Sequence, residues 1–156
     1  MIRNKPWIVT VPLIVLPGFA SGWLSNSGYG NSWFDSLRKP GFMPPGWVFP
    51  IAWTTLYILM GLALARIIAS AAPARRLALH LFAIQFVLNL AWSPVFFGLH
   101  QADIALVVVV VLTIFVAVTI LLFRTIRRSA AVLMMPYLAW LMFATALNFA
   151  IVRLNG

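Results

Sequence analysis

The chain has 156 residues, of which 63% are hydrophobic and only 8% are charged, and its formal net charge is +9. A soluble domain carries about 25% charged residues, so the charges here are too few to cover a soluble surface and an integral membrane protein is predicted. No cysteine, two acids and two histidines are present, which excludes disulfides and thiolate sites and leaves a metal site or a paired-carboxylate mechanism almost nothing to draw on.

Five apolar segments are long enough to cross a membrane, which takes about 20 residues in a helix. They are predicted at residues 7–25, 46–70, 77–99, 102–123 and 130–152. Only the first connection, residues 26–45, is long. The predicted fold is therefore an all-α bundle of five transmembrane helices, formed by a single domain of residues 1–156.

The cations divide unevenly between the two ends of this bundle. One end has eight: Arg3, Lys5, Arg66, Arg75, Arg76, Arg124, Arg127 and Arg128. The other end has Arg38, Lys39 and Arg153, together with both acids, Asp35 and Asp103. Cytoplasmic loops carry the excess of lysine and arginine, so a cytoplasmic N-terminus is predicted if the chain lies in a bacterial inner membrane. The positive charge is thus expected to flank membrane spans and not to bind nucleic acid.

Four spans carry a distinctive helical face. The first has small residues at Gly18, Ser21, Gly22 and Ser25. The second has Trp53, Tyr57, Met60 and Leu64, the third has Gln85, Asn89, Trp92 and Phe96, and the fifth has Tyr137, Trp140, Ala144 and Asn148. Amides inside a bilayer need partners, so these faces are expected to turn into the bundle. Aromatic rings that converge there with a few amides describe a pocket for a flat, largely apolar ligand.

Structural alternatives stand beside this interpretation. An intramembrane asparagine commonly bonds a neighbouring helix, and the Gly18/Gly22 pair commonly forms a packing surface. Tryptophans near span ends, such as Trp7, Trp23 and Trp47, are typical interfacial anchors. His80 and His100 fit interfacial positions, with axial haem ligation as the alternative.

The fourth span has no proline, tryptophan, asparagine or glutamine. It is apolar on all faces and is interpreted as scaffold that faces lipid, with Asp103 as its N-cap.

Three stretches repeat tryptophan, proline and asparagine at fixed spacing: WFDSLRKPGFMPPGWVFPIAWTTLY, NLAWSPVFFG and PYLAWLMFATALN. In these stretches the chain resembles the tryptophan-rich sensory proteins, also called translocator proteins or peripheral benzodiazepine receptors. The resemblance covers nearly the whole chain. It implies a five-helix bundle, a homodimer, and binding of porphyrin, haem and related tetrapyrroles, with benzodiazepine-type drugs and sterols such as cholesterol as eukaryotic ligands.

The resemblance also implies which residues line the pocket. These are Trp53, Asn89, Trp92, Trp140, Ala144 and Leu147, with Phe34 and Pro45 in the loop above it. Tyr57 joins them one turn after Trp53. The prolines at 40, 44 and 45 are expected to stiffen that loop, and Pro50 is expected in the first turns of the next helix. The implied dimer is favoured on the third span, where Ala83 and Ala91 lie.

The chain departs from the family pattern at three positions. Phe34 stands where tyrosine is common, Phe42 where tryptophan is usual, and Phe149 where the proposed cholesterol motif needs tyrosine. Sterol binding is therefore expected less than tetrapyrrole binding.

The leading functional prediction is a membrane receptor or carrier for tetrapyrroles that needs no cofactor and holds no metal site. An alternative from the resemblance is a light-dependent porphyrin-modifying enzyme with Trp53 and Trp140 as electron donors. An ion-coupled transporter would often show inverted repeats and intramembrane charges, and neither is evident here. A structural membrane scaffold is the remaining alternative.

Overall fold

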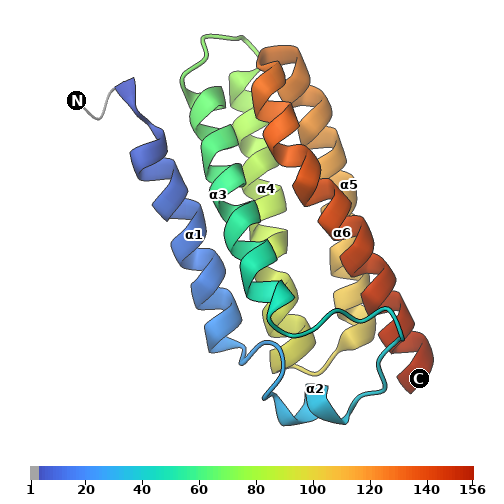
Figure 1. The fold of residues 1–156 in the computed structure, drawn as a ribbon. Helices are drawn as coiled ribbons and strands as arrows, with labels where there is room; N and C mark the ends of the chain where they lie inside the picture. The colour runs from blue at the N-terminus through green and yellow to red at the C-terminus, as the bar shows by residue number, and fades with distance from the viewer. Residues whose placement is uncertain (1–3) are drawn as a thin grey trace.

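A computed structural model describes residues 4–156 and builds them into five long helices with a short sixth one (Figure 1). The long helices are α1 (Trp7–Leu24), α3 (Val48–Ile68), α4 (Arg75–Ser93) continued by the π-helical turn η2 (Pro94–Gly98), α5 (Ala102–Ile126) and α6 (Arg128–Asn155). All five are long and apolar enough to cross a membrane. The predicted all-α, five-span fold is confirmed, and Pro50 is the third residue of α3, as expected.

The helix boundaries differ from the prediction by a few residues, most at the last two spans. Helix α5 ends at Ile126 and α6 runs from Arg128 to Asn155, beyond the predicted 123 and 130–152. Arginine, threonine and asparagine at these ends are polar enough to suggest loops, yet they continue the helices as the chain leaves the hydrocarbon. Asp103 is the second residue of α5, after the capping residue Gln101, so its predicted role as N-cap is wrong.

The third span changes its winding at Pro94, where α4 passes into η2. Proline has no N–H, so the Leu90 carbonyl one turn earlier loses its usual helical donor. The Ser21 hydroxyl of α1 donates to that carbonyl at 2.7 Å. The carbonyl that Pro94 leaves without a donor in α4 thus binds α1.

The long first connection is more ordered than a plain loop and contains α2 (Ser32–Ser36). Asn31 caps this helix, because its Oδ1 accepts a hydrogen bond from the Phe34 N–H at 3.2 Å. The same side chain donates from Nδ2 to the Phe97 carbonyl of η2 at 3.2 Å. Helix α2 therefore lies across one end of the bundle, below the long helices in Figure 1.

The helices pack in a ring in which α1 contacts α3, α3 contacts α6, α6 contacts α5, and α5 contacts α4. Helix α4 closes the ring through weaker contacts with α1 and α3. The approach of α1 to α3 is close at Gly61, where an added Cβ would lie 2.6 Å from Cα of Val11. The Thr10 hydroxyl donates to the Gly61 carbonyl at 2.7 Å in the same contact.

The interpretation of α5 as scaffold that faces lipid describes only one face of this helix. Val109, Leu112 and Val116 are buried against the neighbouring helices, while Val107 and Leu121 are more than 60% exposed. Lipid tails and the bundle interior are both apolar, so an all-apolar helix gives no periodic signal for which face is which.

The cations gather at two ends, as predicted. The start of α1, the α3–α4 connection and the α5–α6 connection lie at one end, and α2 and the C-terminus lie at the other (Figure 1). Seven of the eight cations assigned to the first end belong to it, and Arg3 lies outside the described residues.

Candidate functional site

A cavity of about 640 Å³ opens inside the half of the bundle that α2 covers. Side chains from α1, α3, α4, η2, α5 and α6 line it, together with the connection around α2. Sites for drug-sized ligands have volumes of roughly 300–1,000 Å³, so the cavity is large enough for a small organic molecule.

Eight of the nine predicted ligand-binding residues meet in this lining. They are Phe34, Trp53, Tyr57, Asn89, Trp92, Trp140, Ala144 and Leu147. The ninth, Pro45, is exposed on the loop and outside the lining, between Met43 and Gly46, which belong to it. His100 stacks on Trp33 with ring centroids 4.7 Å apart, outside the lining, and His80 is exposed near the opposite end.

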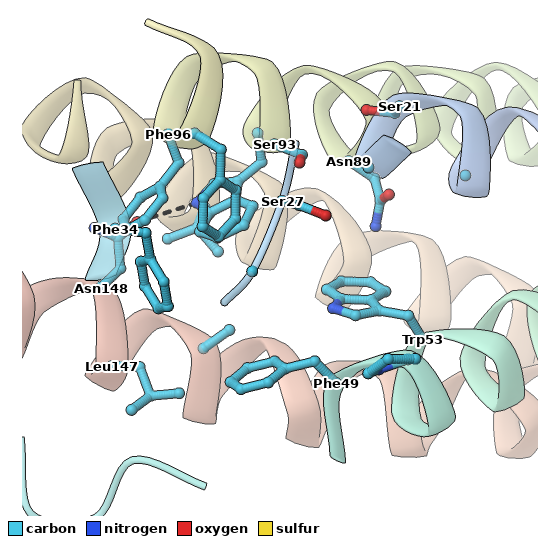
Figure 2. A pocket seen from close by; sticks show the side chains of 18 of the residues that line it. Ser21, Ser27, Phe34, Phe49, Trp53, Asn89, Ser93, Phe96, Leu147 and Asn148 are labelled. Carbon is cyan, nitrogen blue, oxygen red and sulfur yellow. Dashed lines mark hydrogen bonds between the residues drawn. The ribbon is translucent and has the colours of Figure 1, made fainter. Parts of the chain in front are cut away.

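Two tryptophans form an aromatic wall. The rings of Trp53 on α3 and Trp140 on α6 are 6.3 Å apart and nearly perpendicular, at 85°. Phe49 meets Trp140 edge to face at 5.9 Å. Edge-to-face rings favour one another through the ring quadrupole, so the wall is held by its own contacts. In Figure 2, Trp53 and Phe49 lie on one side of the cavity and Phe34 and Phe96 on the other.

Asn89 lies where the cavity meets a buried chain of hydrogen bonds. Its Oδ1 accepts from the Tyr57 hydroxyl at 2.9 Å, and its Nδ2 donates to the Tyr137 hydroxyl at 2.7 Å. Tyr137 donates in turn to Oε1 of Gln85 at 3.0 Å. An amide has two donors and two lone pairs, so each half of the Asn89 amide keeps one further bond available. The geometry favours the helix–helix role considered for this asparagine.

A second amide fixes Trp92. The indole N–H of Trp92 donates to Oδ1 of Asn148 at 3.0 Å, drawn as the dashed line in Figure 2. Asn148 donates from Nδ2 to the Ala102 carbonyl at the start of α5 at 2.9 Å. Asn148 of α6 therefore joins α4 and α5, and it fixes one tryptophan of the cavity wall.

Two buried polar atoms at the cavity have no hydrogen-bond partner within residues 4–156: Oγ of Ser93 and Nε1 of Trp140. Leaving such an atom unpaired costs about 1–3 kcal/mol. Within these residues, Trp140 is thus held by packing against aromatic and other apolar side chains and not by a hydrogen bond.

The cavity is covered by the connection around α2. Phe34 is 3% exposed and packs edge to face on Phe97, with ring centroids 5.2 Å apart. The Lys39 ammonium donates to the Phe34 carbonyl at 2.8 Å and lies 4.6 Å from the centre of its ring. Arg38 and Asn155 exchange two hydrogen bonds of 2.9 Å, which attach the loop to the end of α6.

Some lining residues were not predicted. Trp23 and Trp47, interpreted as interfacial anchors, also lie at the rim of the cavity, where both remain mostly exposed. Val109 and Leu112 of α5 line it too, and no sequence signal marked them. Asn148 was marked by its place on the inward face of the fifth span.

The lining holds no charged side chain among the described residues. Within the same part of the chain, no three His, Cys, Asp or Glu residues come together in a metal-binding group. The chemistry this site offers is aromatic stacking, apolar burial and a few neutral hydrogen bonds.

Comparisons with known proteins agree on one group. A family model described as the TspO/MBR family matches residues 9–154. A tryptophan-rich sensory protein from Cereibacter sphaeroides is 46% identical over 125 residues, which cover 80% of this chain and 78% of the relative. The tryptophan-rich protein TspO of Chlorobaculum tepidum is 43% identical over 127 residues, 80% of each chain. The translocator protein of Bos taurus is 36% identical over 149 residues, 92% of this chain and 88% of the relative.

Proposed function

The chain belongs to the TspO/MBR family, and on that premise we propose that it is a membrane receptor or carrier that binds porphyrin, haem and related tetrapyrroles in the cavity. The observation that carries the proposal is an uncharged cavity with two tryptophans on one wall. Relatives are named as sensory and as translocator proteins, which supports a role in sensing or moving the ligand.

The lining suggests how such a ligand would be held. A flat macrocycle would gain apolar burial and stacking against Trp53 and Trp140. Its carboxylates would remain near the mouth, because burying an unpaired charge costs far more free energy than contacts with the cavity wall would supply. The cations at that end of the bundle are Arg38, Lys39 and Arg153.

A titration with protoporphyrin tests this proposal on the purified full chain, followed by quenching of tryptophan fluorescence. Trp140→Phe keeps an aromatic ring but removes contact area. Losing a stacking partner costs about 1–3 kcal/mol and this loss is partial, so the dissociation constant should rise about fivefold to tenfold. Tm should fall only slightly, because phenylalanine keeps part of the aromatic packing and the lost N–H has no partner within the described residues.

The matched control is Trp7→Phe, at the opposite end of the bundle and half-exposed. It removes the same fluorophore and should leave affinity within twofold. Saturable quenching that weakens only in Trp140→Phe supports the proposal, and equal affinity in all three proteins contradicts it. Light-dependent absorbance bands that vanish in Trp53→Phe or Trp140→Phe would favour the porphyrin-modifying enzyme instead.

A further inference from the structure

A second hollow lies on the outside of the bundle, between α3 and α6. Ala52 and Thr55 of α3 and Pro136, Ala139 and Phe143 of α6 form its sides, above Leu56 and Trp140. The Thr55 hydroxyl donates to the Ile51 carbonyl at 2.9 Å, so it offers no free donor to the groove. The groove is therefore apolar and faces the space that lipid tails fill.

The two helix faces that form this groove continue beyond it toward the cation-rich end. On α3, residues 52, 55, 59, 62 and 66 follow one another at steps of three and four, which places them on one face. On α6, residues 129, 132, 136, 139 and 143 do the same. The two helices run side by side (Figure 1), and the faces meet at the cation-rich end, where Nη1 of Arg66 lies 3.5 Å from Oγ of Ser129.

Cations at this end have no acid to pair with. Asp35 and Asp103, the only acids in the chain, lie at the opposite end. The Arg75 guanidinium already has hydrogen-bond partners, because its Nη1 donates to the carbonyls of Ile68 and Ser70. The Arg66 guanidinium has five N–H donors. Within residues 4–156, its one hydrogen bond is the long contact with Ser129. Arg128, next to Ser129 at the start of α6, is exposed.

The facing surfaces of α3 and α6, from Arg66 and Ser129 to Thr55 and Ala139, form a seam whose length matches one leaflet of a membrane. Thr55 precedes Arg66 by 11 residues and Ser129 precedes Ala139 by 10, about 15 Å along each helix at 1.5 Å per residue. Half of a hydrocarbon core about 30 Å thick is the same length. A phospholipid whose phosphate binds Arg66 would therefore place the end of an acyl chain in the groove.

We propose that the seam between α3 and α6 binds one anionic phospholipid, with its phosphate on Arg66 and Arg128 and an acyl chain in the groove against Trp140. Arginine suits a phosphate because its planar fork matches the oxygens in a bidentate pair. Trp140 lines both this groove and the inner cavity, so the lipid chain would pack on the outer side of the wall that faces the cavity. The lipid would bind there whichever ligand the inner cavity takes.

Native mass spectrometry and melting of the full chain in neutral detergent test it, with dioleoylphosphatidylglycerol against dioleoylphosphatidylcholine. One phosphatidylglycerol should bind in preference and raise Tm. A cation near a membrane surface contributes about fivefold to anionic lipid binding, so Arg66→Gln and Arg128→Gln should each weaken the dissociation constant about fivefold or more. Arg76→Gln removes the same charge at the start of α4, outside the facing surfaces of α3 and α6, and should change the dissociation constant less than twofold.

Ala139→Phe tests the acyl chain, because a ring at this position fills the groove while the arginines remain. It should abolish the Tm gain from phosphatidylglycerol, whereas Val118→Phe on the exposed side of α5 should preserve it. Each gain is measured from the variant's own lipid-free Tm, so a loss of intrinsic stability does not obscure the result. Equal binding of both lipids, equal effects of Arg66→Gln and Arg76→Gln, or a full gain in Ala139→Phe would each overturn the proposal.

Discussion

Asn89 joins α3, α4 and α6 through one carboxamide, with Tyr57 on one side and Tyr137 on the other. All three residues are buried, at 7% exposure or less. Replacing the amide would leave two tyrosine hydroxyls without this partner in a site that is shielded from bulk water. Asn89, which was predicted to contact the ligand, therefore also holds three helices together.

Asn89→Ala should lower stability before it affects binding. Hydrogen bonds between membrane helices contribute about 0.6 kcal/mol on average and up to about 1.7, so losing two should cost roughly 1–3 kcal/mol. For a chain of this size that corresponds to a fall in Tm of about 2–10 °C. Gln101→Ala, an exposed amide just before α5, is the control and should leave Tm unchanged. A normal Tm with weakened protoporphyrin binding would instead assign Asn89 to the ligand.

At the scale of the helices, α1 is held to α3 by close approach at glycines. Gly61 lies against the backbone of Val11, and Gly18 lies against the ring of Tyr57, where an added Cβ would be 2.6 Å from Cζ. The sequence predicted a packing surface at Gly18 and Gly22, and the contact of Gly18 with Tyr57 is packing of this kind within one chain.

Gly61→Ala should separate these helices, because backbone atoms cannot move aside as a flexible side chain would. Overpacking a tight contact typically costs 1–3 kcal/mol, or about 2–10 °C in Tm. Gly98→Ala is the control, since an added Cβ there meets nothing within 4 Å. Equal Tm values for the two variants would show that the α1–α3 contact relaxes freely.

The loop over the cavity is attached at Asn155, whose side chain both donates to and accepts from the Arg38 backbone. Asn155→Ala removes both bonds and should speed amide hydrogen exchange in residues 37–47, since exposed hydrogen bonds of this kind govern local opening. Leu154→Ala, the exposed neighbour, should leave exchange in that loop unchanged. Exchange at its normal rate in Asn155→Ala would mean that α2 alone holds the loop.

For the whole molecule, the outer face of α4 is the surface that the resemblance links to a dimer. Ala83 is exposed there, Ala91 is half-buried, and Ile84 and Val87 are 44% and 64% exposed. Small side chains on a helix face allow a second helix to approach closely in lipid. We therefore propose that this face pairs two copies of the chain.

Ala83→Leu adds bulk to that face and should shift the detergent-solubilised protein from dimer toward monomer in light scattering. Val107→Leu, on the exposed side of α5, adds less volume elsewhere and should leave the mass unchanged. A monomeric parent protein, or a dimer that tolerates Ala83→Leu, would refute the proposed interface.

The sequence alone determined the features that depend on local composition and spacing. Too few charges and five long apolar segments were enough to predict a membrane bundle, and polar connections separated its spans. A 3.6-residue period was enough to bring Trp53, Asn89, Trp92 and Trp140 toward one cavity, because a helix turns side chains by a constant angle.

Only the tertiary structure decided which groups meet across the chain. The two tyrosines on Asn89 lie 32 and 48 residues from it, and Asn155 reaches Arg38 across 117 residues. The buried face of α5 could not be predicted, because an apolar side chain has nearly the same free energy in lipid as in the protein interior. Partners, buried faces and the seam between α3 and α6 follow from how helices pack against one another, and no local pattern in the sequence specifies that.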